Sequence, residues 1–96
     1  MKTNFEAMKE ITNYRWANSK NIRFGVVNED EANFIRTELS LTEKSNTELS
    51  NARDFAVLYL EMKCRDDEKN RADWFDLMSM ITYIIDCEKV KRGVAV

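Results

Sequence analysis

Histidine and proline are absent from this chain of 96 residues, and glycine and cysteine occur only twice each. Without histidine the chain lacks the commonest general base and the commonest ligand for transition metals. With two glycines it cannot form a glycine-rich phosphate-binding loop. No stretch rich in proline or glycine marks a linker between domains. We therefore expect a single domain, residues 1–96, that consists mainly of long helices.

A large excess of either charge is also missing, since the net charge is -2 and the pI is near 5.2. Nucleic-acid-binding domains normally carry a basic patch or stripe, which this balance does not favour. Hydrophobic residues make up 44% and charged residues 33%, as in a folded globular domain. The first residues include Glu6 and Glu10 and no continuous apolar stretch, so we expect no secretion signal and a cytoplasmic protein.

Two helices are predicted from capping boxes, in which a serine or threonine is followed three residues later by a glutamate. One box begins at Thr3 and the other at Ser45. In this motif each side chain accepts a hydrogen bond from the other residue's backbone N–H, which satisfies donors that a helix leaves unpaired at its start. We expect helices at about 4–18 and 46–65.

Two further helices are predicted from charges at their ends. Asn28 precedes three carboxylates, at 29–31, which favour the positive end of the helix dipole and begin a stripe of apolar residues. The last helix starts within 66–73 and ends in a basic turn before Gly93, a natural C-terminal cap. The segment 22–27 is either an extended connector or a short strand, and a strand would need 93–96 or a second copy of itself as its partner.

The segment 74–87 holds ten apolar residues in fourteen positions, but Asp76 and Asp86 interrupt it, so we do not expect it to span a membrane. At 100° per residue it has one arc of the width typical of a core-facing helix. That predicted core arc consists of Trp74, Leu77, Met78, Ile81, Ile84 and Ile85. The corresponding arc of the third helix consists of Ala52, Phe55, Leu58, Tyr59 and Met62.

Two such broad apolar helices joined by a short turn predict an antiparallel hairpin at the centre of a mainly α fold, a small bundle of three to four helices. In that hairpin Cys64 and Cys87 would be about 25 to 30 Å apart, too far for a disulfide. Free thiols suit a reducing compartment.

Apolar side chains remain outside the core arc of the last helix, at Phe75, Met80, Tyr83 and Cys87. Two arrangements that bury these side chains are consistent with the pattern. The first helix could pack there within the same chain, through Met8, Ile11, Tyr14 and Trp16. Alternatively, another protein or a second copy of the chain could bind there, because exposed apolar patches usually mark interaction sites. The candidate partner-binding residues are Phe75, Met80, Tyr83 and Trp16.

Carboxylates are the only plausible catalytic groups. Asp73 and Asp76 lie three apart on one helix, as in the metal sites of all-α nucleotide hydrolases, but such sites need three or four converging carboxylates. The run from Asp66 resembles a calcium loop but has Arg71 where the loop needs glycine. Neither cysteine has the spacing of a zinc site. We therefore expect no enzyme, no metal and no cofactor.

We predict from these observations a module that binds another protein or forms a homodimer. By analogy of size and lack of motifs alone, we expect an accessory protein of a phage or mobile element that inhibits a host protein, such as a component of a defence system. The alternative is a small nucleic-acid-binding transcriptional regulator, which would use basic residues near the two ends of the chain. Those residues are Arg15, Lys20, Arg23, Lys91 and Arg92.

Overall fold

The computed structural model describes residues 2–94, and within that range it contains four α-helices and no strand. The prediction of a mainly helical chain is confirmed. The helices are α1 (Asn4–Ala17), α2 (Glu29–Leu39), α3 (Asn46–Asp66) and α4 (Arg71–Lys91). Single 3-10 turns lie in each of the three connections. Part of the segment 93–96, the proposed strand partner, lies outside the described residues.

Both predicted capping boxes are present. The Thr3 hydroxyl accepts the backbone N–H of Glu6 at 3.1 Å, and the Glu6 carboxylate accepts the N–H of Thr3 at 3.1 Å. Ser45 and Glu48 repeat this exchange at 3.1 and 2.9 Å. Because both bonds of each box join residues three apart, the starts of α1 and α3 could be predicted from short stretches of sequence.

Glycine ends α4 as expected. Gly93 has a φ of +75°, in the left-handed region that favours glycine. Its N–H donates to the carbonyl of Val90 at 3.0 Å, and the N–H of Val94 donates to the carbonyl of Lys89 at 2.9 Å. This pair of bonds is the Schellman motif, which satisfies carbonyls that the last turn of a helix leaves unpaired.

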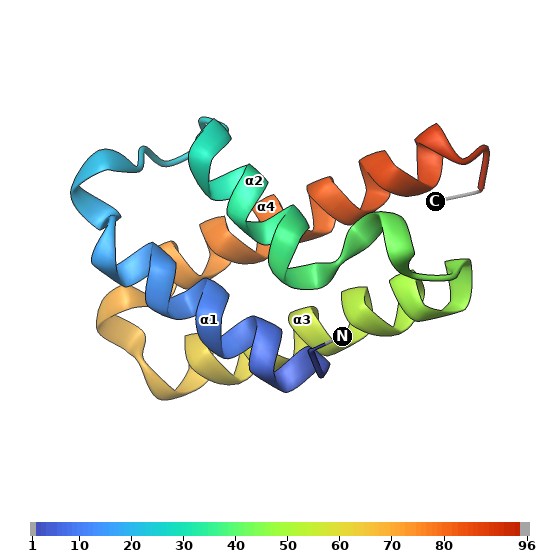
Figure 1. The fold of residues 1–96 in the computed structure, drawn as a ribbon. Coiled ribbons are helices and arrows are strands. Elements are labelled where there is room, and N and C mark those ends of the chain that lie inside the picture. Colours follow the sequence, from blue (N-terminus) through green and yellow to red (C-terminus); the bar gives the residue numbers. More distant parts are fainter. Residues whose placement is uncertain (1, 95–96) are drawn as a thin grey trace.

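The closest neighbours in the fold are α3 and α4, which lie side by side (Figure 1). Lys89 donates to the hydroxyl of Ser50 at 2.8 Å, and Arg53 donates to the carboxylate of Asp86 at 3.0 Å. Partners therefore occur in opposite order along the two helices. On the other side of the core, α1 packs on α2 and α3, and α2 also packs on α4.

The core lies between these four helices. The predicted arc of α4 is buried at Trp74, Leu77, Ile81, Ile84 and Ile85, and Met78 packs against the core while partly exposed. Ala7, Met8 and Ile11 contribute from α1, and Ala32, Ile35 and Leu39 from α2. Every buried side-chain nitrogen or oxygen of the described residues has a hydrogen-bond partner.

The predicted core arc of α3 is wrong in part. The buried residues of α3 are Leu49, Ala52, Ala56, Leu60 and Cys64. Phe55 and Tyr59 are partly buried at the edge of the core, whereas Leu58 and Met62 are exposed. Both sides of α3 are apolar, so the helix pattern alone did not decide which side the other helices cover. The small side chains of Ala52 and Ala56 allow neighbouring helices to approach α3 closely. The larger side chains of Leu58 and Met62, which are exposed, would keep a neighbouring helix further away.

The connector between α1 and α2 is not a strand. After a 3-10 turn at Ser19–Asn21, residues 22–27 form an irregular segment with a turn at Gly25, whose φ is +72°. A Cβ placed on Gly25 would meet no atom within 4 Å, so the requirement for glycine comes from its backbone conformation. The connector alternative is thus the one observed, although the segment turns at Gly25 and is not extended throughout.

Candidate functional site

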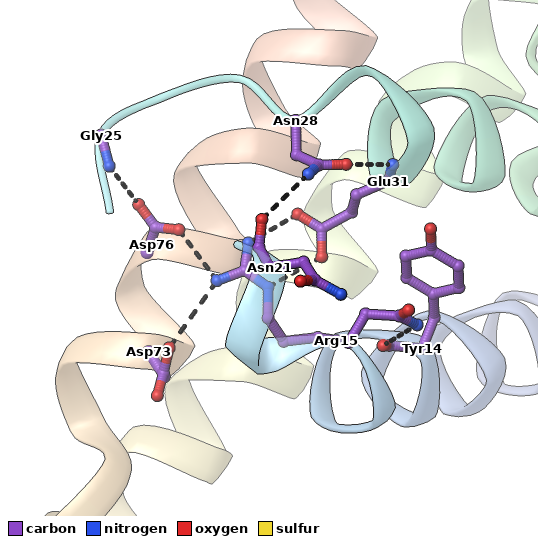
Figure 2. A network of polar contacts seen from close by, with 9 residues as sticks. Tyr14, Arg15, Asn21, Gly25, Asn28, Glu31, Asp73 and Asp76 are labelled. Carbon is purple, nitrogen blue, oxygen red and sulfur yellow. Dashed lines mark hydrogen bonds and ion pairs between the residues drawn. The ribbon is translucent and has the colours of Figure 1, made fainter. Parts of the chain in front are cut away.

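A buried ion pair joins the last turn of α1 to the first turn of α2. The Nε of Arg15 donates to one carboxylate oxygen of Glu31 and its Nη2 to the other, both at 2.7 Å. The two side chains are 1% and 0% exposed. This bidentate geometry is the strongest form of side-chain hydrogen bonding, and both partners are removed from water to make it (Figure 2).

Arg15 also contacts α4. Its Nη1 donates to Asp76 at 2.8 Å and lies 3.8 Å from a carboxylate oxygen of Asp73. The other carboxylate oxygen of Asp76 accepts the backbone N–H of Gly25 at 3.0 Å (Figure 2). One arginine therefore connects α1, α2 and α4, and Asp76 extends the network to the turn of the connector.

The start of α2 belongs to the same network. Asn28 caps α2 by accepting the N–H of Glu31 at 2.9 Å, and its amide nitrogen lies 3.4 Å from the carbonyl of Asn21. Thus Glu31 is oriented by its backbone as well as by its carboxylate (Figure 2).

Burial by itself lowers the pKa of Arg15, because it disfavours the charged form. The hydrogen bonds and negative charges of Glu31 and Asp76 outweigh that effect, and the net shift in the pKa of Arg15 is upward. The guanidinium is therefore held in its charged state, as a permanent cation among three carboxylates.

The carboxylates considered as metal ligands turn toward this cation. Asp73, Asp76 and Glu31 do converge, but they surround Arg15. Among residues 2–94, no three Asp, Glu, Cys or His side chains gather in a way that could hold a metal ion. The sequence interpretation of Glu31 as a helix-start charge was incomplete, because its role as the partner of Arg15 joins positions 16 apart and has no local signal.

A small hollow lies where the connector meets α4. Its volume is about 160 Å³. It is lined by Gly25, Val26, Val27, Asp76, Ser79, Met80 and Tyr83. Val26, Val27 and Tyr83 are largely exposed, and so is the neighbouring Phe24. Apolar side chains from the connector and α4 thus form one surface, which the bond between Gly25 and Asp76 holds together.

The four predicted partner-binding residues do not share one face. Tyr83 is 55% exposed beside the hollow, while Met80 is only 7% exposed and lies beneath it. Phe75 is exposed on another side of α4, in a shallow depression with residues of α3. Trp16 stacks on Trp74 with ring centroids 4.4 Å apart.

The predicted internal cover of the secondary face of α4, packing of the first helix there, does not match the structure in full. Met8 and Ile11 of α1 enter the main core, and Tyr14 stacks on Phe34 of α2 at 4.4 Å. Next to Tyr83 it is the connector, rather than α1, that lies against α4.

The five basic residues of the nucleic-acid alternative are separated. Arg15 is buried and paired, so it cannot contact a phosphate. Arg92 donates to Glu88, to Asn46 and to the carbonyls of Leu41 and Lys44. The connector that carries Lys20 and Arg23 and the end of α4 that carries Lys91 lie at opposite ends of the molecule (Figure 1).

Both cysteines are free thiols, with Cys64 buried and Cys87 exposed. None of the helices in the described range combines the length and the apolar character that crossing a bilayer requires.

Comparison of the chain with protein-family models, with curated proteins and with solved structures finds no match.

Proposed function

We propose that this protein is a non-enzymatic module that binds another protein through the surface where the connector meets α4. The observation that carries the proposal is the hollow beside Tyr83 with its exposed apolar rim. Exposed apolar groups that surround a depression are typical of sites that receive a partner's side chain. We call this surface the Tyr83 face and define it by Phe24, Val26, Val27, Met80 and Tyr83.

The way the Tyr83 face is held supports the proposal. The connector would lose conformational entropy on binding if it were free to move, and that loss weakens association. Here the bond from Gly25 to Asp76 ties the connector to α4, and Arg15 in turn holds Asp76. A loop fixed in this way before binding retains more of its interaction free energy as affinity.

The scaffold in this proposal is a small bundle around an antiparallel hairpin of α3 and α4, acting in the cytoplasm. From its size and its lack of catalytic sequence motifs we further propose an accessory protein of a phage or mobile element, which inhibits a host protein such as a component of a defence system. The carboxylates that an enzyme would need are turned toward Arg15.

The alternative, a nucleic-acid-binding regulator, has weaker support, because Arg15 is buried and the remaining cations lie at two ends of the molecule. Salt distinguishes the two functions. Binding to phosphates weakens steeply between about 50 and 200 mM salt, whereas binding through an apolar face changes little.

Capture from a host lysate with immobilised wild type and variants tests the proposal. Wild type should retain a protein that Tyr83→Asp and Val26→Asp lose. Val90→Asp should retain it, because Val90 is similarly exposed but lies about two turns further along α4, outside the lining of the hollow. Equal capture by wild type and the two Tyr83-face variants would contradict the proposal. So would a retained partner that nuclease treatment or 200 mM salt releases, which would favour the regulator.

A further inference from the structure

A second apolar surface lies on the solvent side of α3 and is independent of the Tyr83 face. Four apolar or aromatic residues lie on one stripe of the helix, because they follow one another at spacings of three, one and three residues. They are Phe55, Leu58, Tyr59 and Met62. Leu58 is 63% and Met62 55% exposed. We call this set the α3 stripe. Phe5 of α1, which is also exposed, extends it by an edge-to-face contact with Tyr59 at 6.1 Å.

Two charged residues flank the α3 stripe on one side. Arg65 follows Asp54 by eleven residues, which is about three turns and brings both to the same side of the helix. Both are exposed, and within the described part of the chain neither side chain makes an ion pair or hydrogen bond. Opposite charges thus stand at the two ends of an exposed apolar stripe.

The positions of these charges fit an antiparallel copy of the same helix. The midpoint between Asp54 and Arg65 falls between Tyr59 and Leu60, and the midpoint between Leu58 and Met62 falls at Leu60. A twofold axis there would bring Asp54 of each chain opposite Arg65 of the other, and Leu58 opposite Met62. Self-complementarity of this kind is what an interface with twofold symmetry requires.

We propose that the α3 stripe is a homodimer interface in which two copies of α3 pack antiparallel, with two Asp54–Arg65 ion pairs between the chains. The twofold axis lies on the solvent side of α3, at the height of Leu60 along the helix. The apolar stripe supplies the buried centre and the charges select the antiparallel orientation. Glu61 lies on the charged side close to the axis, where it would face its own copy. Its substitution by glutamine should therefore tighten the dimer.

The first test measures the mass of the full chain by sedimentation equilibrium from about 1 μM to about 1 mM. Wild type should change from monomer to dimer within this range, and Leu58→Glu should raise the dissociation constant at least about thirtyfold. Val90→Glu is the matched control, because Val90 is 62% exposed on α4, and it should dimerise like wild type. A wild type that stays monomeric at about 1 mM would overturn the proposal, as would equal loss in both variants.

A charge exchange tests the antiparallel arrangement without touching the apolar stripe. Asp54→Arg and Arg65→Asp should each weaken the dimer about tenfold, because each places like charges opposite one another at both ends. An equimolar mixture should form a heterodimer at least as tight as wild type, since one chain then carries two arginines and the other two aspartates. The doubly exchanged chain should also recover the wild-type dissociation constant.

Other outcomes identify other occupants. In a parallel pair Asp54 would already face Asp54, so the single exchanges would not weaken the dimer, and that result would overturn the arrangement. If Tyr83→Asp dissociates the dimer while Leu58→Glu does not, the Tyr83 face is the self-association surface instead. Circular dichroism of each variant should match wild type, because all the substituted residues are exposed.

Discussion

Arg15 of α1 and Glu31 of α2 form a bidentate ion pair in the interior, with both N–O distances at 2.7 Å. Taking two charges out of water is costly, and the attraction between them repays that cost only when the geometry is good and the remaining hydrogen-bonding groups are satisfied. Both conditions hold here, because Arg15 also donates to Asp76. We therefore expect this pair to contribute more to a defined packing of α1 on α2 than to total stability.

Arg15→Met should lower the free energy of unfolding by about 3 to 5 kcal/mol, because it leaves the carboxylate of Glu31 buried without a cation. Urea unfolding followed by circular dichroism measures the change. Arg53→Met is the control. Its ion pair with Asp86 is partly exposed, so its loss should cost about 1 kcal/mol or less.

The double variant Arg15→Met with Glu31→Leu gives a further check on the ion pair. Removing both charges together should recover much of the stability that Arg15→Met loses. If the double variant were less stable than Arg15→Met alone, the cost of the single variant would not come from an unpaired carboxylate.

Asp76→Ala should free the connector from α4 while the helices remain folded, because it removes the acceptor of the Gly25 N–H. Hydrogen exchange should become faster at the Gly25 amide and leave the amides of the α3 core unchanged. Ser79→Ala, beside the same hollow, is the matched control, since Ser79 does not bond the connector. Unchanged exchange at Gly25 would show that other contacts hold the connector.

Ile81→Asp should prevent folding, because Ile81 is fully buried and the variant would place an unpaired charge in the core. Tyr83→Asp, two residues further on, should change the free energy of unfolding by about 1 kcal/mol or less, since that side chain is largely exposed. Thermal unfolding by circular dichroism distinguishes these results. Unfolding by Tyr83→Asp would mean that the Tyr83 face belongs to the core.

Stability should fall in acid partly through the capping boxes. The pKa of Glu48 is lowered from its ordinary 4.5, first by the backbone N–H of Ser45 and then by the Ser45 hydroxyl. The folded chain therefore releases this proton at lower pH than the unfolded chain. The stabilisation by Glu48 is fully present above about pH 4.5 and is lost as the pH falls through the lower, folded-state pKa.

Glu48→Gln tests this titration, because glutamine can still accept the hydrogen bond but carries no proton that titrates. Urea midpoints from pH 7 to pH 3 should fall less for Glu48→Gln than for wild type. Glu10→Gln, whose side chain caps no helix, should follow wild type. Parallel curves for all three proteins would contradict the prediction.

The two thiols should react at very different rates. Cys87 is exposed, whereas burial raises the pKa of Cys64 and so disfavours its reactive thiolate. A chromogenic disulfide reagent should label one thiol rapidly in the native protein and the second only when urea unfolds it. Cys87→Ser should remove the rapid phase. Two rapid phases in wild type would show that the end of α3 opens readily.

The starts of α1, α2 and α3 and the end of α4 could be predicted because their signals are local, whereas α4 begins at Arg71 without a side-chain cap and its start was predicted only to within 66–73. Thr3, Asn28 and Ser45 each bond a backbone N–H three residues away, and Gly93 adopts a conformation that few other residues accept. The core arc of α4 could be predicted too, because one of its sides is much more apolar than the others. These properties depend on the spacing of residues along one helix and need no knowledge of its neighbours.

The α3 stripe, the Arg15 network and the connector's part of the Tyr83 face were decided by tertiary structure alone. The sequence shows apolar residues on both sides of α3, and only the approach of α1 and α4 at Ala52 and Ala56 leaves Leu58 in solvent. Likewise, Arg15 and Asp76 are 61 positions apart and meet only because α1 and α4 enter one core. Such pairs depend on which packing of several helices has the lowest free energy, and no local pattern encodes that choice.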